Sequence, residues 1–409
     1  MGFNFSRFLL PLFIEGYRIA AMEGHPFAQY RIGVYNSTGI GVERDPQKAL
    51  EWFHKAAEQG YPPAHYAIGM YYEKGVGVEK NLQKAFEWVH KAAVAGNAHA
   101  QYKIGIYCVN GNGVIKDPQD AVGWFLEAAE QRYPPAQTSL GRCYLKGIGV
   151  EKSPQRGAEW FIEAAKQGYP PAQISLGICY RDGTGVEKDP QEAFEWYQRA
   201  AEQGYPPAQA SLAMCYLDRT GVEKDSRKVS EWFLKAAEQG YPPAQLNLGL
   251  CYTKGIGVEK CPRKGMEWLI RAAEQGYAPA QQAIGVCYIN GIGVENDPRK
   301  AIEWYRKAAE QGSPYAQYAL GVYYSEGVGV VKNRQTGLEW LRKAADQDCA
   351  LGILAHLALE SYEGYCEFPS RVPNAQHPDA PFPEHIGMRR RNYKGSRTLQ
   401  MSDSRCLTC

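Results

Sequence analysis

Apolar residues recur along this chain at helical spacings, in pairs of stripes separated by a short polar stretch. Ala172, Leu176 and Tyr180 lie four residues apart and mark one stripe. Trp196 and Ala200 lie on a second stripe further along the chain. Because an α-helix brings residues four apart onto one face, each stripe predicts an amphipathic helix. The two stripes together predict a helical hairpin.

Glycine and proline residues mark the ends of these two helices. Gly183 and Gly185 supply the positive φ that a tight reversal needs. Asp189 followed by Pro190 is typical of an N-cap and a first helical residue. Gly204 is placed to end the second helix, and the Tyr-Pro-Pro that follows prevents its continuation.

The hairpin repeats along most of the chain with a period of 36 residues. One such hairpin cannot bury both of its faces, so successive hairpins must stack. The sequence therefore predicts an all-α fold, a right-handed superhelical α/α solenoid of 36-residue helix-turn-helix repeats. All nine tryptophans keep the period without an insertion or deletion, at Trp52, Trp88, Trp124, Trp160, Trp196, Trp232, Trp268, Trp304 and Trp340.

The predicted organisation has four parts. Residues 1–25 are expected to form an N-terminal half-repeat that caps the stack, and residues 26–348 form nine repeats. Residues 349–362 are expected to form a closing helix. Residues 363–409 form a disordered tail, first rich in proline and then basic, because proline excludes helix and the segment cannot build a core.

The repeated pattern A-x-x-x-L-G-x-x-Y-x-x-G-x-G-V, followed by K-A, W and K-A-A-x-x-G, resembles the Sel-one-like repeat, a relative of the tetratricopeptide repeat. The resemblance covers residues 26–348 without a gap. It implies a scaffold that binds other proteins, since members of this family are adaptors in signalling, endoplasmic-reticulum quality control, cell-wall synthesis and host–pathogen contact. It does not identify the partner, because one fold serves many functions.

Positions that vary between repeats are free to specify a partner, whereas constant positions pack the stack. The positions two, six and nine residues after the first alanine of each repeat share one face of the first helix, which lines the concave side in this repeat class. Tyrosines on that face suit the anchoring of a peptide, although they could also serve only to pack along the groove. The expected partner-binding residues are Tyr30, Val34, Tyr66, Met70, Tyr102, Ile106, Arg142, Ile174, Leu246, Gln282 and Tyr318.

Composition and motifs exclude several other classes of protein. Lys and Arg total 46 against 44 Asp and Glu, and this net charge of +2 favours neither nucleic acid nor an acidic membrane as a partner. The glycine-rich turns do not continue into a phosphate-binding loop, and the eight histidines lack metal-ligand spacing. No catalytic motif is present. We therefore expect a monomeric non-enzyme without a cofactor or a metal.

Five cysteines occupy one column of the repeat, at Cys143, Cys179, Cys215, Cys251 and Cys287. No second column is available to pair with them, which predicts buried, reduced thiols and a cytoplasmic protein. The alternative is a secreted repeat adaptor, since the apolar run FLLPLFI near the N-terminus resembles a short signal sequence. The other interpretation of that run is a cap on the first core.

The tail carries a basic run at Arg389–Arg391, Lys394 and Arg397 and ends in the sequence CLTC. As a C-a-a-X box, this ending predicts prenylation of Cys406, with the basic run as the second membrane signal. The arrangement is similar to fungal chitin-synthase activators, which implies a membrane-tethered regulator of a cell-wall synthase as an alternative function. Thr408 departs from that motif because it is not aliphatic, and cysteine is uncommon at its last position. A nuclear-import signal or an inert end are further interpretations.

The sixth repeat departs from the pattern at Ala213, Arg219 and Ser226, which replace two glycines and a proline. Arg219 falls where the turn needs a positive φ, a conformation that costs an L-residue about 1 kcal/mol. We expect either a looser or altered turn in this repeat or simple sequence drift.

Overall fold

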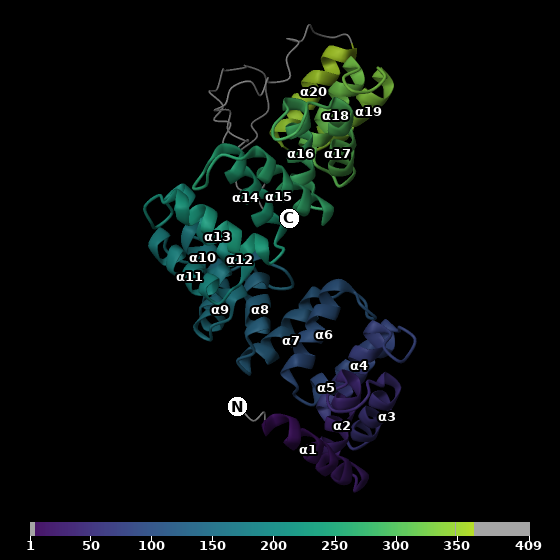
Figure 1. Cartoon of the computed structure of the whole chain (residues 1–409). Coiled ribbons are helices and arrows are strands. Elements are labelled where there is room, and N and C mark those ends of the chain that lie inside the picture. The colour runs from purple at the N-terminus through teal and green to yellow at the C-terminus, as the bar shows by residue number, and fades with distance from the viewer. Residues whose placement is uncertain (1–4, 348, 364–409) are drawn as a thin grey trace.

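The computed structural model of the protein describes residues 5–347 and 349–363. Within these residues all regular structure is helical, and twenty helices follow one another in chain order. Each helix packs mainly on its neighbours in the sequence, so the hairpins stack into an elongated, curved array (Figure 1). The predicted all-α, right-handed solenoid of helical hairpins is confirmed.

Nine of the described helices begin the hairpins, and we call each of them helix A of its repeat. Proline occupies the first turn of most of them, where its missing N–H leaves no hydrogen bond unmade. Each ends at a residue in the left-handed conformation, such as Gly183 with a φ of 69°. They are α2 (Pro26–Thr38), α4 (Pro62–Lys74), α6 (Ala98–Asn110), α8 (Pro134–Lys146), α10 (Pro170–Asp182), α12 (Pro206–Asp218), α14 (Pro242–Lys254), α16 (Ala278–Asn290) and α18 (Pro314–Glu326).

Nine further helices complete the hairpins, and we call each of them helix B. Most begin at an Asp, Asn or Ser that caps the helix: Asp189 Oδ1 accepts hydrogen bonds from the backbone N–H of Gln191 (2.9 Å) and of Glu192 (3.1 Å). They are α3 (Pro46–Glu58), α5 (Leu82–Val94), α7 (Pro118–Glu130), α9 (Pro154–Lys166), α11 (Pro190–Glu202), α13 (Ser226–Glu238), α15 (Pro262–Glu274), α17 (Pro298–Glu310) and α19 (Arg334–Ala345).

Small residues set the distance between helix A and helix B of each hairpin. A Cβ added to Gly177 of α10 would lie 2.6 Å from the ring of Tyr197 in α11, closer than atoms can pack. Ala193 and Ala200 of α11 are fully buried on the same side as Tyr197. The core is therefore a column of alanines and aromatic rings that runs between the two layers of helices.

In all but one of the repeats, a buried glutamine ties the repeat to the element before it. Gln173 of α10 is 4% exposed, and its Nε2 donates to the backbone carbonyl of Ala165 at the end of α9 (3.3 Å). Its Oε1 accepts a hydrogen bond from Gln203 Nε2 after α11 (2.9 Å). We call such a glutamine with these two bonds a glutamine rung. Rungs also form at Gln29, Gln101, Gln137, Gln209, Gln245, Gln281 and Gln317.

The second repeat has no rung. His65 stands where the other repeats have the buried glutamine, and Ala95 stands where they have its partner. The His65 ring stacks on Trp88 with centroids 5.6 Å apart, and His54 of α3 meets the same indole edge-on at 5.3 Å. Aromatic packing thus replaces amide hydrogen bonds at the joint of α3, α4 and α5.

The turn of the sixth repeat keeps the backbone of the other turns. Arg219 ends α12 in the left-handed conformation, with a φ of 62°. Asp225 still caps α13, although Ser226 replaces the usual proline. Of the two alternatives, an altered turn is therefore wrong, and sequence drift stays a prediction: the repeat retains the geometry and accepts the strain of a side chain at positive φ.

A helix closes each end of the stack. The first, α1 (Phe5–Met22), buries Ile14 against Ile32 of α2, as a cap on the first core would. The last, α20 (Ala350–Glu363), covers the ninth repeat and lies one residue later than the sequence predicts. Across the described residues, no helix is both long enough and apolar enough to cross a membrane. The basic run and Cys406 lie outside the described residues.

Candidate partner-binding surface

The sequence-predicted binding residues lie along helix A of successive repeats, and we call this surface the helix A face. Arg142 is exposed, whereas Tyr318 is buried. The others are half-buried, so each side chain both packs on the stack and presents part of its surface to solvent: Tyr30, Val34, Tyr66, Met70, Tyr102, Ile106, Ile174, Leu246 and Gln282.

The tyrosines of this face are anchored on the core beneath them. The Tyr30 ring lies 5.6 Å from Phe53, and the Tyr102 ring lies 5.8 Å from Phe125, both distances between ring centroids. Burial raises the pKa of Tyr66 to about 12, so its hydroxyl stays protonated at neutral pH. The ring is fixed while the hydroxyl can donate or accept a hydrogen bond, which suits recognition of a peptide backbone.

A second row of tyrosines runs beside the first and was not predicted as part of this surface. These residues precede helix A of their repeats, where the sequence predicts only a chain break before one or two prolines. Their side chains make no cap hydrogen bond, and they reach the helix A face instead: the Tyr30–Tyr61 and Tyr102–Tyr133 rings lie 5.5 and 5.6 Å apart. The row is Tyr61, Tyr133, Tyr169, Tyr205, Tyr241 and Tyr277, all half-buried. Its 36-residue spacing is the signal that could have revealed it.

Fixed charges accompany the aromatic rows in the N-terminal half. Lys103 Nζ of α6 lies 2.8 Å from Glu73 of α4, and both side chains are only about one-fifth exposed, at 21% and 19%. Arg142 of α8 acts on Tyr169, since its charge opposes the rise that burial causes in the pKa of that hydroxyl. The helix A face therefore combines aromatic and aliphatic surface with a few oriented polar groups, the composition of a peptide-binding surface.

Tyr318 is the one predicted binding residue that the fold removes from the surface. It is 9% exposed and packs in one cluster with Leu341, Ala355 and Leu359, under the closing helix α20. The sequence placed it by its position in the repeat, which ignores the cap that follows. We correct its assignment to the core of the ninth repeat.

Helix B carries a second recurrent feature that sequence analysis missed. In seven repeats a lysine or arginine three residues after the tryptophan lies over the indole, with the cation 3.8 to 4.4 Å from the ring centroid. Residues three apart are neighbours on a helix surface, and an indole face attracts cations. We call this arrangement an indole–cation stack.

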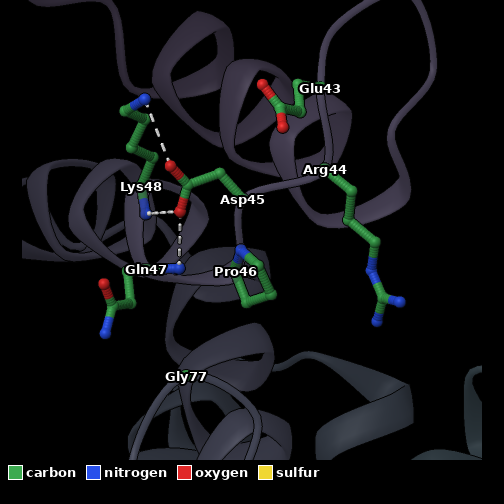
Figure 2. A pocket seen from close by; sticks show the side chains of 7 residues that line it. All are labelled: Glu43, Arg44, Asp45, Pro46, Gln47, Lys48 and Gly77. Atoms are coloured by element: carbon green, nitrogen blue, oxygen red, sulfur yellow. Dashed lines mark hydrogen bonds and ion pairs between the residues drawn. The ribbon is translucent and has the colours of Figure 1, made fainter.

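The turns between helices leave shallow hollows. One of about 300 Å³ lies at the start of α3, where Gly77 of the following repeat borders it. Figure 2 shows Asp45 turned toward Gln47 and Lys48, with Glu43 and Arg44 pointing away from it. The backbone N–H of Lys48 lowers the pKa of the Asp45 carboxyl, which is already used as a helix cap. A similar hollow lies at Pro262 and Gly293, so these hollows are products of turn stacking.

The column of cysteines is buried in the core, as the sequence predicts. Cys143, Cys179, Cys215, Cys251 and Cys287 are at most 5% exposed and are free thiols. Burial raises the pKa of Cys179 to about 11 and that of Cys215 to about 12. These thiols stay protonated at neutral pH and act as small core side chains.

The hairpins, turns and caps define a helical-repeat solenoid of the class that binds other proteins along its helices. The chain belongs to the Sel1 repeat family, which matches nine consecutive segments from residues 26–61 to residues 314–349. Solenoids of this family commonly serve as protein-interaction scaffolds.

Two solved structures are similar to this chain over most of its length. One is c5321, a protective antigen of uropathogenic Escherichia coli strains with an SLR fold, at 33% identity and a TM-score of 0.59 over 86% of this chain and 83% of that chain. The other is a Sel1 repeat protein from Oxalobacter formigenes, at 31% identity and a TM-score of 0.54 over 76% of this chain and 89% of that chain. Comparison with curated proteins finds no match.

Proposed function

We propose that the protein is a non-enzymatic scaffold whose helix A face, on the concave side of the solenoid, binds a segment of another protein. The observation that carries the proposal is the double row of tyrosines, anchored on the core and continued by half-buried aliphatic residues. Such a surface offers rigid rings and hydroxyls at a regular spacing, which favours an extended or helical segment laid along several repeats.

The residues that vary along this face support a graded specificity. Tyr30, Tyr66 and Tyr102 dominate the N-terminal repeats, while Ile174 and Leu246 follow further along. A segment with polar and aromatic groups toward one end and aliphatic groups toward the other is the complement of this order. We also propose a cytoplasmic location, because the buried free thiols suit a reducing compartment.

The proposal is tested with the full chain and two matched double variants. Arg142→Glu with Ile178→Asp changes two exposed residues of the helix A face, since Ile178 occupies the same position in the fifth repeat as Arg142 in the fourth and is 37% exposed. Arg227→Glu with Val94→Asp makes the same chemical changes at exposed residues of helix B. Proximity labelling in the cells that express the protein, read by quantitative mass spectrometry, gives the set of neighbours for each form.

We expect the helix A variant to lose its principal neighbours by about tenfold, equivalent to about 1.4 kcal/mol. The helix B variant should keep them. Circular dichroism should show the same helix content in all three forms. An unchanged set of neighbours for the helix A variant, or a loss confined to the helix B variant, would contradict the proposal.

A further inference from the structure

Two repeats break the indole–cation stack in the same way. Trp124 of α7 is followed three residues later by Glu127, and Trp160 of α9 by Glu163. Both indoles are half-buried and both carboxylates are exposed. Over the residues that the structure describes, no lysine or arginine lies over either indole, and the His90 ring meets Trp124 edge-on with centroids 5.6 Å apart. We call these four residues the acidic tryptophan pair.

The surroundings of the pair favour an incoming positive charge. Helix α7 carries Asp120, Glu127 and Glu130 and no basic residue. Glu127 Oε2 accepts a hydrogen bond from Gln101 Nε2 of α6 at 2.9 Å, which fixes the carboxylate between α7 and α6. A carboxylate next to an indole attracts a cation by charge and by the ring quadrupole together.

The basic groups of the chain near the pair are held too weakly, or too firmly elsewhere, to exclude a cation from a partner. Lys166 Nζ lies 3.7 Å from Glu163, but the two side chains are 63% and 54% exposed, and such a surface pair is weak. Arg156 is engaged over the Tyr144 ring at 4.4 Å. Arg132, after the end of α7, is exposed and makes no described contact with the pair.

From these observations we infer that the acidic tryptophan pair is a second interaction site, which receives two basic side chains of a partner protein. The seven complete stacks show which ligand fits this register, because each holds a Lys or Arg within 4.4 Å of the indole centroid. In the third and fourth repeats the partner supplies that cation. The site lies on helix B and is separate from the helix A face.

The stacking of successive repeats fixes the distance between the two basic residues of the partner. Trp124 and Trp160 are one repeat apart, and successive helix layers lie about 10 Å apart. A polyproline II segment rises about 3.1 Å per residue with three residues per turn, so side chains three positions apart lie on one face and span about this distance. The ligand class is therefore an extended segment with Arg or Lys at positions i and i+3.

The basic run of this chain is a poor match for its own site. It begins 26 residues after Glu363, whereas the pair lies five to six repeats before that end, on the order of 50 Å away. The separation favours a segment of another protein over the basic run of this chain.

The test measures the fluorescence anisotropy of a labelled peptide, GSRSGRSG, with the full chain at low ionic strength. The decisive variant is Glu127→Lys with Glu163→Lys, which gives both repeats the cation that seven other repeats already carry. We expect it to fold like the wild type and to bind the peptide at least about tenfold more weakly. Failure of the peptide to bind the wild-type chain would overturn the inference.

Glu130→Lys with Glu159→Lys is the control, since it changes the net charge of α7 and α9 equally without placing a cation at the stacking position. We expect it to weaken binding less than about threefold. An equal loss of peptide affinity in both variants would mean that the peptide binds through the general negative charge of the two helices. That result would overturn the role of the indoles. A wild-type dimer that dissociates when Arg389, Arg390 and Arg391 are changed to Ser would assign the site to a second copy of this chain instead.

Discussion

Most turns contain two glycines with different roles. The sixth repeat shows the difference, because it keeps only the second of them. The first ends helix A in the left-handed conformation, and Arg219 adopts the same conformation in its place with a φ of 62°. The second, Gly185 in the fifth repeat, combines a φ of 76° with close approach to the carbonyl of Pro154 in the preceding repeat. At the equivalent position the sixth repeat keeps Gly221. Only the second glycine is therefore required by both the backbone and its neighbour.

We expect Gly185→Ala to destabilise the protein more than Gly183→Ala. Both changes place a side chain at positive φ, which costs about 1 kcal/mol. At Gly185 the added Cβ also overlaps the Pro154 carbonyl, and such overpacking adds about 1 to 3 kcal/mol. Thermal denaturation followed by circular dichroism measures the difference, and equal midpoints for the two variants would refute it.

Single residues also show which features of the fold can be predicted from the sequence and which cannot. Turn glycines, Asp189 as a cap and the buried cysteines were predictable, because each follows from a local rule. The glutamine rungs were not, since a polar residue beside an alanine indicates an exposed position until its partners 8 and 30 residues away are known. The indole–cation stacks were within reach, because Trp and Lys or Arg three residues apart share a helix face.

At the scale of helices, the hydrophobic period predicted the type and order of the elements, but not which faces the neighbouring helices cover. Tyr318 occupies the same position in its repeat as Tyr66, yet α20 buries it. The sequence predicts only a connection at the tyrosines before helix A, such as Tyr133, although they share the surface with Tyr102. Both errors have one cause, since the covering element lies in another repeat.

Because Tyr318 is buried and Tyr66 is half-buried, replacing each of them by alanine should change the stability by different amounts. Tyr318→Ala should remove a buried ring and lower the free energy of unfolding by about 3 kcal/mol. Tyr66→Ala should produce a smaller loss, because part of that ring already faces solvent. Urea denaturation of the two variants provides the measurement. A larger loss for Tyr66→Ala would mean that the tyrosine column is primarily core.

At the scale of the whole molecule, stability depends on contacts between adjacent repeats, because distant repeats do not touch. Eight glutamine rungs reinforce these contacts, and the second repeat lacks one. Burial, and secondarily Lys91, lowers the pKa of His65, and burial lowers that of His54 against the opposing charge of Glu58. The joint of α3, α4 and α5 is therefore the part of the stack that responds to acid.

We expect the stability of this joint to be complete above about pH 6.5 and to fall below it. A lowered histidine pKa means that the unfolded chain binds protons more readily than the folded chain, so protonation favours unfolding. His65→Gln with Ala95→Gln should supply the missing rung, raise the stability by about 1 kcal/mol and reduce the acid sensitivity. Thermal midpoints at about pH 7 and about pH 5 make the comparison.

The single variant His65→Gln is the control, because it removes the titrating group without its partner. It should lose the acid sensitivity of His65 but not gain the added stability. If the double variant were as acid-sensitive as the wild type, the histidine would not be the cause.

The missing rung also has a mechanical meaning. A stack of repeats stretched from its two ends carries the same tension through every joint, and it yields where the fewest hydrogen bonds cross. Among the nine repeats, the joint without a rung is between α3 and α4, where His65 replaces a glutamine that elsewhere clamps three helices. Under tension, α1 to α3 should separate as one block and leave the later repeats, with both Trp124 and Trp160, intact.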